Sequence, residues 1–290
     1  MSIVVRAAPI YLTKQVIDIN NEPDPIKLTL ELEIINNAEQ DVYIKVTSTK
    51  YTVENPEQGS VTAGGSRRIH PTIDIPQPAS LPYSDTIDVV IEVYADSNYT
   101  QKLTEGTLEI PLEIDNYEAW ASTTIYTFDE GDEGWTGYDS LDSKSVEPGG
   151  QSLKVHADTS SSQTVTKAFT ITSPEITPTG SRMVVVVYTK VAASSKADNS
   201  IFRASLRVKV YDTVNATERV LNEVWLFYSK TLNLNESEET PWRKLMVEVP
   251  SDMLSNPIQI IIEGELYLYA PSPVVNSIDL YIDHVVIAQQ

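Results

Sequence analysis

The sequence predicts an all-β protein, because one periodicity and one kind of interruption recur along its whole length. Hydrophobic and polar residues alternate, as in residues 26–34, where isoleucines and leucines occupy one face and lysine, threonine and glutamates the other. A period of two is typical of a half-buried strand. Clusters of glycine, proline, asparagine and aspartate separate such segments, as turns do. A single helical turn, at residues 250–256, is all the helix that we expect.

Residues 1–118 are predicted to form an immunoglobulin-like β-sandwich. After residues 26–34, alternation returns in segments 41–49, 66–75, 85–94 and 106–114. These segments are rich in β-branched residues and are bounded by turn signals such as "ENPEQGS" and "TAGGS". Seven or so strands in about 115 residues match the size of such a sandwich. Because the chain has no cysteine, this sandwich would lack the disulfide of antibody domains.

Residues 119–290 are predicted to form a β jelly roll, after a junction at residues 115–124 that shows no strong alternation. Strand-like segments rich in valine, isoleucine, tyrosine and threonine then follow one another to the end of the chain. They are residues 124–128, 152–157, 164–171, 182–191, 201–212, 219–228, 242–250, 258–269 and 278–288. Eight or nine strands in about 170 residues fit a double-sheet jelly roll.

The composition excludes several classes of partner. The chain carries 41 acidic against 21 basic residues, a formal net charge of −20. Phosphate backbones and anionic lipid surfaces would be repelled, so we expect no nucleic-acid partner. No apolar run approaches the ~20 residues that span a bilayer, so we expect no membrane insertion either. The first residues do not form a recognisable signal peptide.

The sequence also gives no sign of catalysis. His70, His156 and His284 are far apart and lack metal-ligand spacing. No nucleophile-elbow, zinc-peptidase or phosphate-loop motif is present, and cysteine chemistry is excluded. With 41 acids, some pair of carboxylates is always available, so a pair indicates a glycosidase only together with geometry. We therefore expect that the protein is not an enzyme.

Four landmarks follow one another along the second half. They are "FDEGDEGW" (128–135), "GGQSLKV" (149–155), "PWRKLMVEV" (241–249) and "LYIDHVVI" (280–287). In this order they resemble the jelly-roll carbohydrate-binding modules, which share a galactose-binding-like fold. The resemblance covers nearly all of the second half and implies a non-catalytic, sugar-binding role for it. The first half looks only like a generic immunoglobulin-like domain.

The resemblance also implies a structural calcium ion near the first and last strands of the module. Carried over onto this chain, the ligands would be Asp129 and Asp283, with backbone carbonyls from residues 145–147. Oxygen ligands from distant strands suit calcium, which accepts irregular geometry. The family has a second acid in its last strand where this chain has His284, and this departure weakens the match. The alternatives are a solvated acidic turn, or two acids packed at a strand junction without metal.

A polar and aromatic face is predicted on two strands of the second half, within residues 201–212 and 258–269. Alternation places the candidate ligand-binding residues opposite apolar ones; they are Arg203, Arg207, Tyr211, Glu263, Glu265, Tyr267 and Tyr269. Aromatic rings stack on sugars, and planar polar side chains bond their hydroxyls. A protein partner would suit the same residues. The other interpretation is an outer sheet face covered by cross-strand ion pairs.

Two functions from different classes fit these observations. The first is a non-catalytic structural or assembly protein on a virion or extracellular surface, such as a virion decoration, spike, turret or surface filament. Its partners would be other copies of itself or another structural protein, with glycan contact as a further role of the second domain. The alternative is a carbohydrate-binding module with an immunoglobulin-like spacer. An exposed aromatic face favours sugar, whereas a large apolar patch favours assembly.

Overall fold

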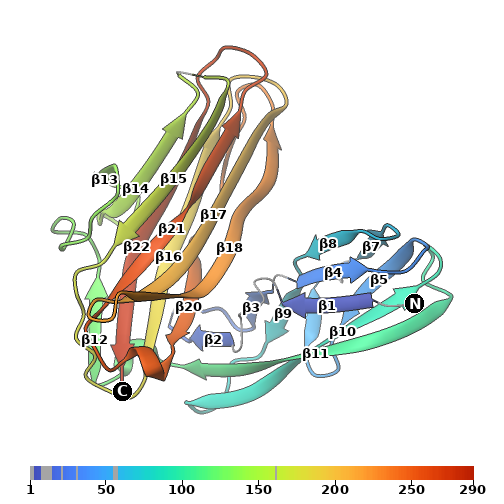
Figure 1. The fold of residues 1–290 in the computed structure, drawn as a ribbon, viewed down its shortest axis with the longest axis horizontal. Coiled ribbons are helices and arrows are strands. Elements are labelled where there is room, and N and C mark those ends of the chain that lie inside the picture. Colours follow the sequence, from blue (N-terminus) through green and yellow to red (C-terminus); the bar gives the residue numbers. More distant parts are fainter. Residues whose placement is uncertain (1–2, 8–14, 21, 31, 55–57, 161) are drawn as a thin grey trace. The chain divides into compact units, whose positions relative to one another are not determined.

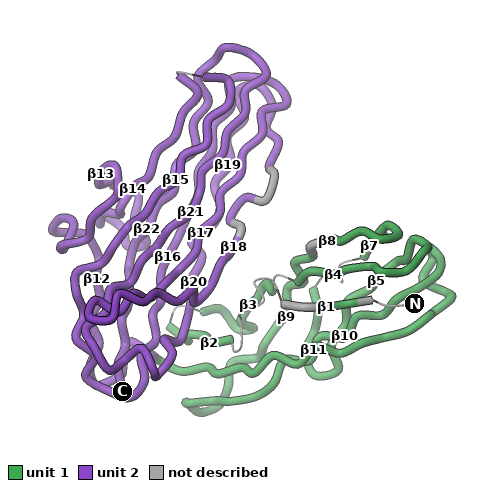
Figure 2. Tube along the Cα trace, viewed as in Figure 1, with its two compact units in different colours: residues 1–116 green, residues 117–290 purple. Residues whose placement is uncertain are grey.

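The computed structural model describes the chain except residues 1–2, 8–14, 21, 31, 55–57 and 161. The described residues form β-strands with connecting turns, and two short 3-10 turns, η1 (Tyr117–Ala119) and η2 (Ser251–Met253). The predicted all-β class is confirmed. Two compact units divide the chain, residues 1–116 and 117–290 (Figure 2). No helix in this described part of the chain is long and apolar enough to cross a membrane.

The described residues of unit 1 form one five-stranded and two three-stranded β-sheets (Figure 1). The five-stranded sheet has the order β2 (Gln15–Asp18), β11 (Lys102–Asp115), β10 (Tyr83–Tyr94), β5 (Val42–Thr47), β7 (Gln58–Val61). One smaller sheet has the order β1 (Ile3–Ala7), β4 (Leu32–Asn36), β8 (Ser66–Ile69). The other has the order β3 (Ile26–Thr29), β9 (Thr72–Ile75), β6 (Thr52–Glu54).

Two segments predicted as single strands each change sheet in unit 1. Residues 26–34 divide into β3, which pairs with β9, and β4, which pairs with β8. Residues 66–75 divide in the same way into β8 and β9. Pro71 lies at this corner, where its carbonyl accepts the Leu30 amide at 3.0 Å. Because proline has no N–H to give to a ladder, the strand breaks at this corner.

Unit 2 consists of two larger antiparallel sheets (Figure 1). The seven-stranded sheet has the order β13 (Ser140–Asp142), β14 (Ser152–Asp158), β22 (Ser277–Gln289), β16 (Met183–Ser194), β19 (Ser237–Glu239). In addition, β12 (Ser122–Tyr126) pairs with β22, and β20 (Arg243–Val249) pairs with β16. The four-stranded sheet has the order β15 (Thr164–Thr172), β21 (Ile258–Tyr269), β17 (Ser200–Asp212), β18 (Thr217–Leu232).

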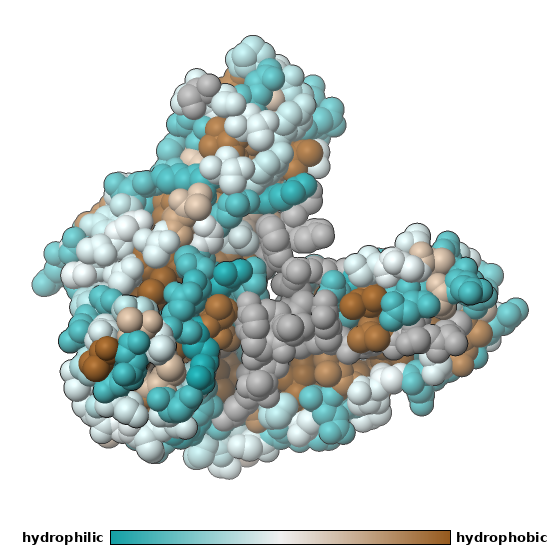
Figure 3. All heavy atoms as spheres, viewed as in Figure 1, coloured by the Kyte–Doolittle hydropathy of each residue, from teal (hydrophilic) through white to brown (hydrophobic). Residues whose placement is uncertain are grey.

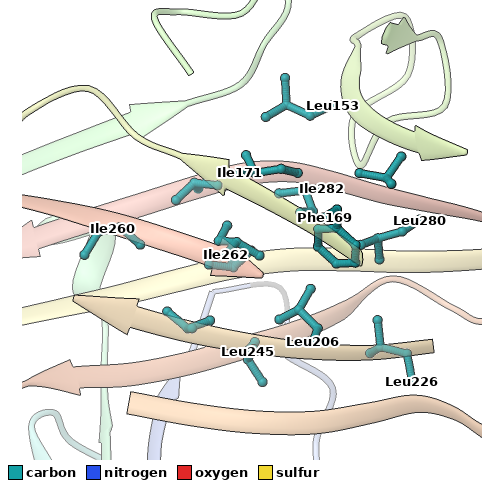
Figure 4. Close-up of a cluster of buried hydrophobic side chains, with 14 of the residues drawn as sticks. Leu153, Phe169, Ile171, Leu206, Leu226, Leu245, Ile260, Ile262, Leu280 and Ile282 are labelled. Carbon is teal, nitrogen blue, oxygen red and sulfur yellow. The ribbon is translucent and has the colours of Figure 1, made fainter. Parts of the chain in front are cut away.

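The core of unit 2 gathers side chains from both of its sheets (Figure 4). Leu206 of β17 and Ile262 of β21 come from the four-stranded sheet, and Leu280 and Ile282 of β22 come from the seven-stranded sheet. Each of these side chains is at most 1% exposed, and burial of one such side chain is worth about 1.5–3 kcal/mol. Since successive residues of a strand point to opposite faces, every second residue of β17 and β21 lies on the outer face.

Candidate functional site

The first candidate site lies where β22 changes its neighbour along one edge. Residues 277–282 pair with β14, whereas residues 285–289 pair with β12. Asp283 and His284 fall between the two ladders. On the other edge of β22, the ladder with β16 shifts register next to Asp283, and His284 has a φ of 46°. Such bulges re-aim side chains, so the backbone itself presents Asp283 at this gap.

Asp283 is a buried carboxylate, only 3% exposed. Its Oδ2 accepts the Val146 backbone N–H at 2.7 Å, and its Oδ1 accepts the N–H of His284 at 2.7 Å. Burial raises the pKa of Asp283 to about 6, against the lowering effect of these two hydrogen bonds, and the negative charge of Asp129 adds to the rise. Asp129 therefore lies close enough for its charge to act on the Asp283 carboxyl.

Asp129 is exposed, and it packs against the same loop that contacts Asp283. Its Oδ1 accepts the Gln151 backbone N–H at 3.0 Å. A Cβ atom at Gly150 would lie 2.4 Å from this Oδ1 and 3.0 Å from the Ser145 Oγ. A side chain at position 150 would therefore push the loop away from Asp129. The loop 145–151 thus lies between the two carboxylates and contacts both.

The donor set at this junction fits a hard cation. Ser152 is fully buried, and its Oγ has no hydrogen-bond partner within the described part of the chain. Ser152 and Asp283 each lie one residue beyond the last β14–β22 pair. A buried polar atom without a partner is a place to expect a water or an ion. Two carboxylates and a hydroxyl are the kind of oxygen ligands that calcium takes.

The rest of a calcium shell would have to come from the backbone and water. Among the described residues there is no group of three or more His, Cys, Asp or Glu side chains that could hold a metal. Two of the predicted carbonyls already accept hydrogen bonds, that of Ser145 from the Trp242 indole N–H at 3.2 Å, and that of Glu147 from the Gly150 N–H at 3.2 Å. A carbonyl oxygen has two lone pairs, so that of Ser145 keeps one for a cation. That of Glu147 also accepts the Ser145 hydroxyl and has none left.

The second candidate site is the outer face of the four-stranded sheet. The seven predicted residues of β17 and β21 share this face, opposite buried residues such as Phe202 and Leu266. They differ in exposure: Arg203 and Glu265 are exposed, whereas the other five are half-buried. The register places Arg203 directly opposite Tyr267. The structure therefore brings the two predicted strands side by side.

An ion-pair network occupies one part of this face. Arg207 contacts Glu263 at 3.2 Å and Glu223 of β18 at 3.3 Å. Lys209 contacts the same Glu263 at 2.8 Å and Glu218 of β18 at 3.2 Å. In this part the face is covered by cross-strand ion pairs, which was one of the two interpretations of the sequence. Tyr211 lies at the same end, with Glu218 and Gln259 as its register partners.

The other part of the face, which we call the open platform, comprises Arg203, Tyr267, Tyr269, Thr164 and Thr166. The Arg203 guanidinium lies over the Tyr267 ring, 5.0 Å from its centroid. On the far side of β21, Thr166 and Thr164 of β15 are the register partners of Tyr267 and Tyr269. Both threonines are exposed. Rings, hydroxyls and a guanidinium thus share one surface.

Sequence reasoning missed the threonines of the open platform and a charged cluster on the seven-stranded sheet. In that cluster His156 Nδ1 lies 2.6 Å from Asp279, and its Nε2 lies 3.2 Å from Asp158. Burial lowers the pKa of His156, but the hydrogen bonds to both aspartates outweigh this, so the pKa is raised. The spacing of the histidines in the sequence gave no signal of this cluster, because Asp279 comes from a distant strand.

Comparison with known proteins gives matches only at the level of structure. No family model matches the chain, and no curated protein matches it. Among solved structures, a carbohydrate-binding module of the β-sandwich superfamily is 13% identical, with 92% of this chain and 98% of that chain covered and a TM-score of 0.30. The PapD-like domain 7 of human CEP192 is 11% identical, with 39% and 83% covered and a TM-score of 0.24.

A chain of infectious bursal disease virus, Gx strain, is 8% identical, with 96% of this chain and 75% of that chain covered and a TM-score of 0.30. The neighbours therefore include a carbohydrate-binding module and a PapD-like domain. At these identities and TM-scores the likenesses carry no argument about what the chain binds, so function has to be argued from its own residues.

Proposed function

We propose that the protein is a non-catalytic surface protein whose unit 2 binds carbohydrate on the open platform. The observation that carries the proposal is the alternation of Tyr267 and Tyr269 on an outer sheet face, flanked by the hydroxyls of Thr164 and Thr166. Sugars present apolar C–H faces that stack on rings and hydroxyls that need polar partners. The open platform offers both kinds of group on neighbouring strands.

The ion-pair network supports this proposal by holding the platform in place. Glu263 is two residues before Glu265 and four before Tyr267 on β21, and it is fixed by Arg207 and Lys209. A binding site on paired strands keeps its geometry better than one on loops. The proposal therefore assigns contact with ligand to the residues of the open platform and to the neighbouring Glu265, and a supporting role to the network.

We further propose that calcium binds between Asp129 and Asp283 as a structural ion. A cation there would offset the cost of keeping Asp283 charged while buried, and it would tie the loop 145–151 to β22. The support is the raised pKa of Asp283, caused by burial, and the buried Ser152 hydroxyl without a partner among the described residues. The ion supplies charge and coordination only, and no reaction is assigned to it.

A glycan microarray tests the proposed function, followed by titration calorimetry with the glycans that bind. Tyr267→Ala and Tyr269→Ala should each weaken binding about tenfold, corresponding to ~1.4 kcal/mol of lost stacking. Tyr211→Ala is the matched control, because it removes the same ring from the same face at the end of the ion-pair network. Equal loss in all three variants, or an array without any binding, would contradict the proposal.

Assembly into a particle or filament is the second candidate. Its support is an end of unit 2 where Leu234 and Val275 are 53% and 57% exposed. The Leu234 N–H donates to Asp198, and Asn276, which follows Val275, is buried and bonds Lys196 and Ser200. On the face in Figure 3, hydrophobic residues of unit 2 form separate spots rather than one broad patch. Light scattering distinguishes the two functions by measuring the mass of the particle in solution. A defined oligomer that dissociates in the variants Leu234→Ser and Val275→Ser supports assembly, whereas a monomer favours the binding module.

A further inference from the structure

Arg203 differs from the other two cations of its face in lacking an acidic partner. Arg207 and Lys209 each contact two glutamates, whereas within the described contacts Arg203 makes no ion pair and touches the Tyr267 ring. This is notable in a chain whose 41 acids outnumber its 21 bases. The nearest acid in register terms, Glu265, is exposed and likewise makes no ion pair with a described residue.

The stacking of Arg203 on Tyr267 prepares the guanidinium for a planar anion. A guanidinium that lies over a ring keeps its N–H edge free, and five N–H donors in a fixed plane match a carboxylate in a two-bond fork. The ring also restricts the side chain, so less rotamer freedom is lost on binding. Arg203 is therefore a ready partner for a carboxylate at the edge of a sugar stacked on the tyrosines.

The charges around Arg203 limit how many anionic groups the ligand can carry. Glu265 lies on the same face, two residues from Tyr267 along β21, and would repel a second acid placed over it. The net charge of −20 repels polyanionic chains as a whole. Neutral sugar hydroxyls, in contrast, can donate to the Glu265 carboxylate. The charges around Arg203 therefore favour a ligand that has one carboxylate among neutral sugar units.

We propose that the ligand of the open platform is a saccharide that bears a single carboxylate, such as a uronic acid branch or a terminal acidic sugar, and that Arg203 binds this carboxylate. This inference rests on the proposed carbohydrate-binding function of the same surface. It adds the chemical class of the ligand and the role of Arg203, which sets specificity, while the tyrosines supply stacking that neutral sugars share.

Titration calorimetry at low salt with matched oligosaccharide pairs tests this class. The probes are methylglucuronosyl-xylotriose against xylotriose, 3′-sialyllactose against lactose, and cellobiouronic acid against cellobiose; each acidic member carries one carboxylate. At least one acidic member should bind at least tenfold more tightly than its neutral counterpart. Arg203→Gln should reduce that preference below twofold, because the acidic member loses much more affinity than the neutral member does. Arg203→Lys keeps the positive charge but cannot make the two parallel N–H bonds to a carboxylate, so it should lose most of the preference.

Arg219→Gln is the matched control, because it removes the same charge from an exposed pair with Asp252 elsewhere in unit 2. It should leave the preference unchanged, and near-ultraviolet circular dichroism checks that every variant is folded. Equal binding of the acidic and neutral members by the wild-type chain overturns the inference and leaves the proposed function standing. A preference that survives Arg203→Gln overturns it as well. No binding of any of the six probes at millimolar concentration overturns both.

Discussion

Replacing the buried Asp283 by asparagine should change the stability of unit 2 in opposite directions with and without calcium. Burial raises the pKa of Asp283 from 3.8 to about 6. A shift of ~2 units corresponds to about 3 kcal/mol at 1.36 kcal/mol per unit. The folded chain binds this proton more tightly than the unfolded chain does, so the free energy of unfolding falls as pH rises from about 4 to about 6, and stays lowered above that range.

Asparagine removes this cost but introduces a smaller one. Its oxygen can accept one of the two backbone N–H groups that now bond Asp283, and its NH₂ group then faces the other, which costs about 1–2 kcal/mol. In a chelator, Asp283→Asn should therefore gain about 1–2 kcal/mol at pH 7 and lose about 1–2 kcal/mol at pH 4. When calcium is present at a hundredfold excess over Kd, the free energy of unfolding of the wild type should rise by ~2.7 kcal/mol. Asp283→Asn should lose most of this increase, because it binds calcium more weakly.

Urea unfolding followed by tryptophan fluorescence measures these differences in unit 2 alone, because all four tryptophans lie within residues 117–290. Glu130→Gln is the matched control, since it removes one charge from an exposed position in the same acidic turn. If Asp283→Asn is less stable than the wild type at pH 7 in chelator, the assigned cost of the buried charge is wrong. If millimolar calcium leaves the wild-type curve in place, the metal proposal is wrong.

Three further predictions follow from the geometry of unit 2. Leu206→Ala should lower the free energy of unfolding by about 2–5 kcal/mol in urea titrations, because it empties a fully buried core position; a loss below 1 kcal/mol would contradict the packing. His156→Gln should lower the melting temperature clearly at pH 5.5 and little at pH 8.5. The raised pKa of His156 means that its contribution is complete below pH 6.5 and is lost as pH rises through the folded value. A difference that grows with pH would reverse this assignment. Gly150→Ala should destabilise unit 2 by about 1–3 kcal/mol, because its Cβ would lie 2.4 Å from the Asp129 Oδ1. An unchanged stability in calorimetry would show that the loop can move away from the new methyl group, and would contradict this prediction.

The local part of the fold could be predicted from the sequence because it depends on a period of two. Alternation predicts where the strands lie and which face each residue takes. Leu206 and Ile262 point inward in the structure, as expected, while Arg203 and Tyr267 point outward. The corner in unit 1 shows the limit of this signal. Residues 26–34 alternate without a break, yet their two ends belong to different sheets.

The candidate sites depend on which strands become neighbours, and the pattern of a single strand does not contain this. Glu218 and Glu223 of β18 engage Lys209 and Arg207, so half of the predicted face is occupied by ion pairs. Thr164 and Thr166 complete the open platform only because β15 pairs with β21. The exchange of β14 for β12 beside Asp283 is likewise a long-range event, which creates a buried charge out of an ordinary alternating strand.

Backbone amide shifts in an NMR titration test the central claim most directly, with the tightest-binding oligosaccharide of the six probes and the chain labelled with ¹⁵N. Binding on the open platform predicts the largest shifts at Thr164, Thr166, Arg203, Glu265, Tyr267 and Tyr269, and small shifts along β14, β16 and β20 of the other sheet. Shifts concentrated on the seven-stranded sheet, or in unit 1, would contradict the claim that this outer face is where unit 2 binds carbohydrate.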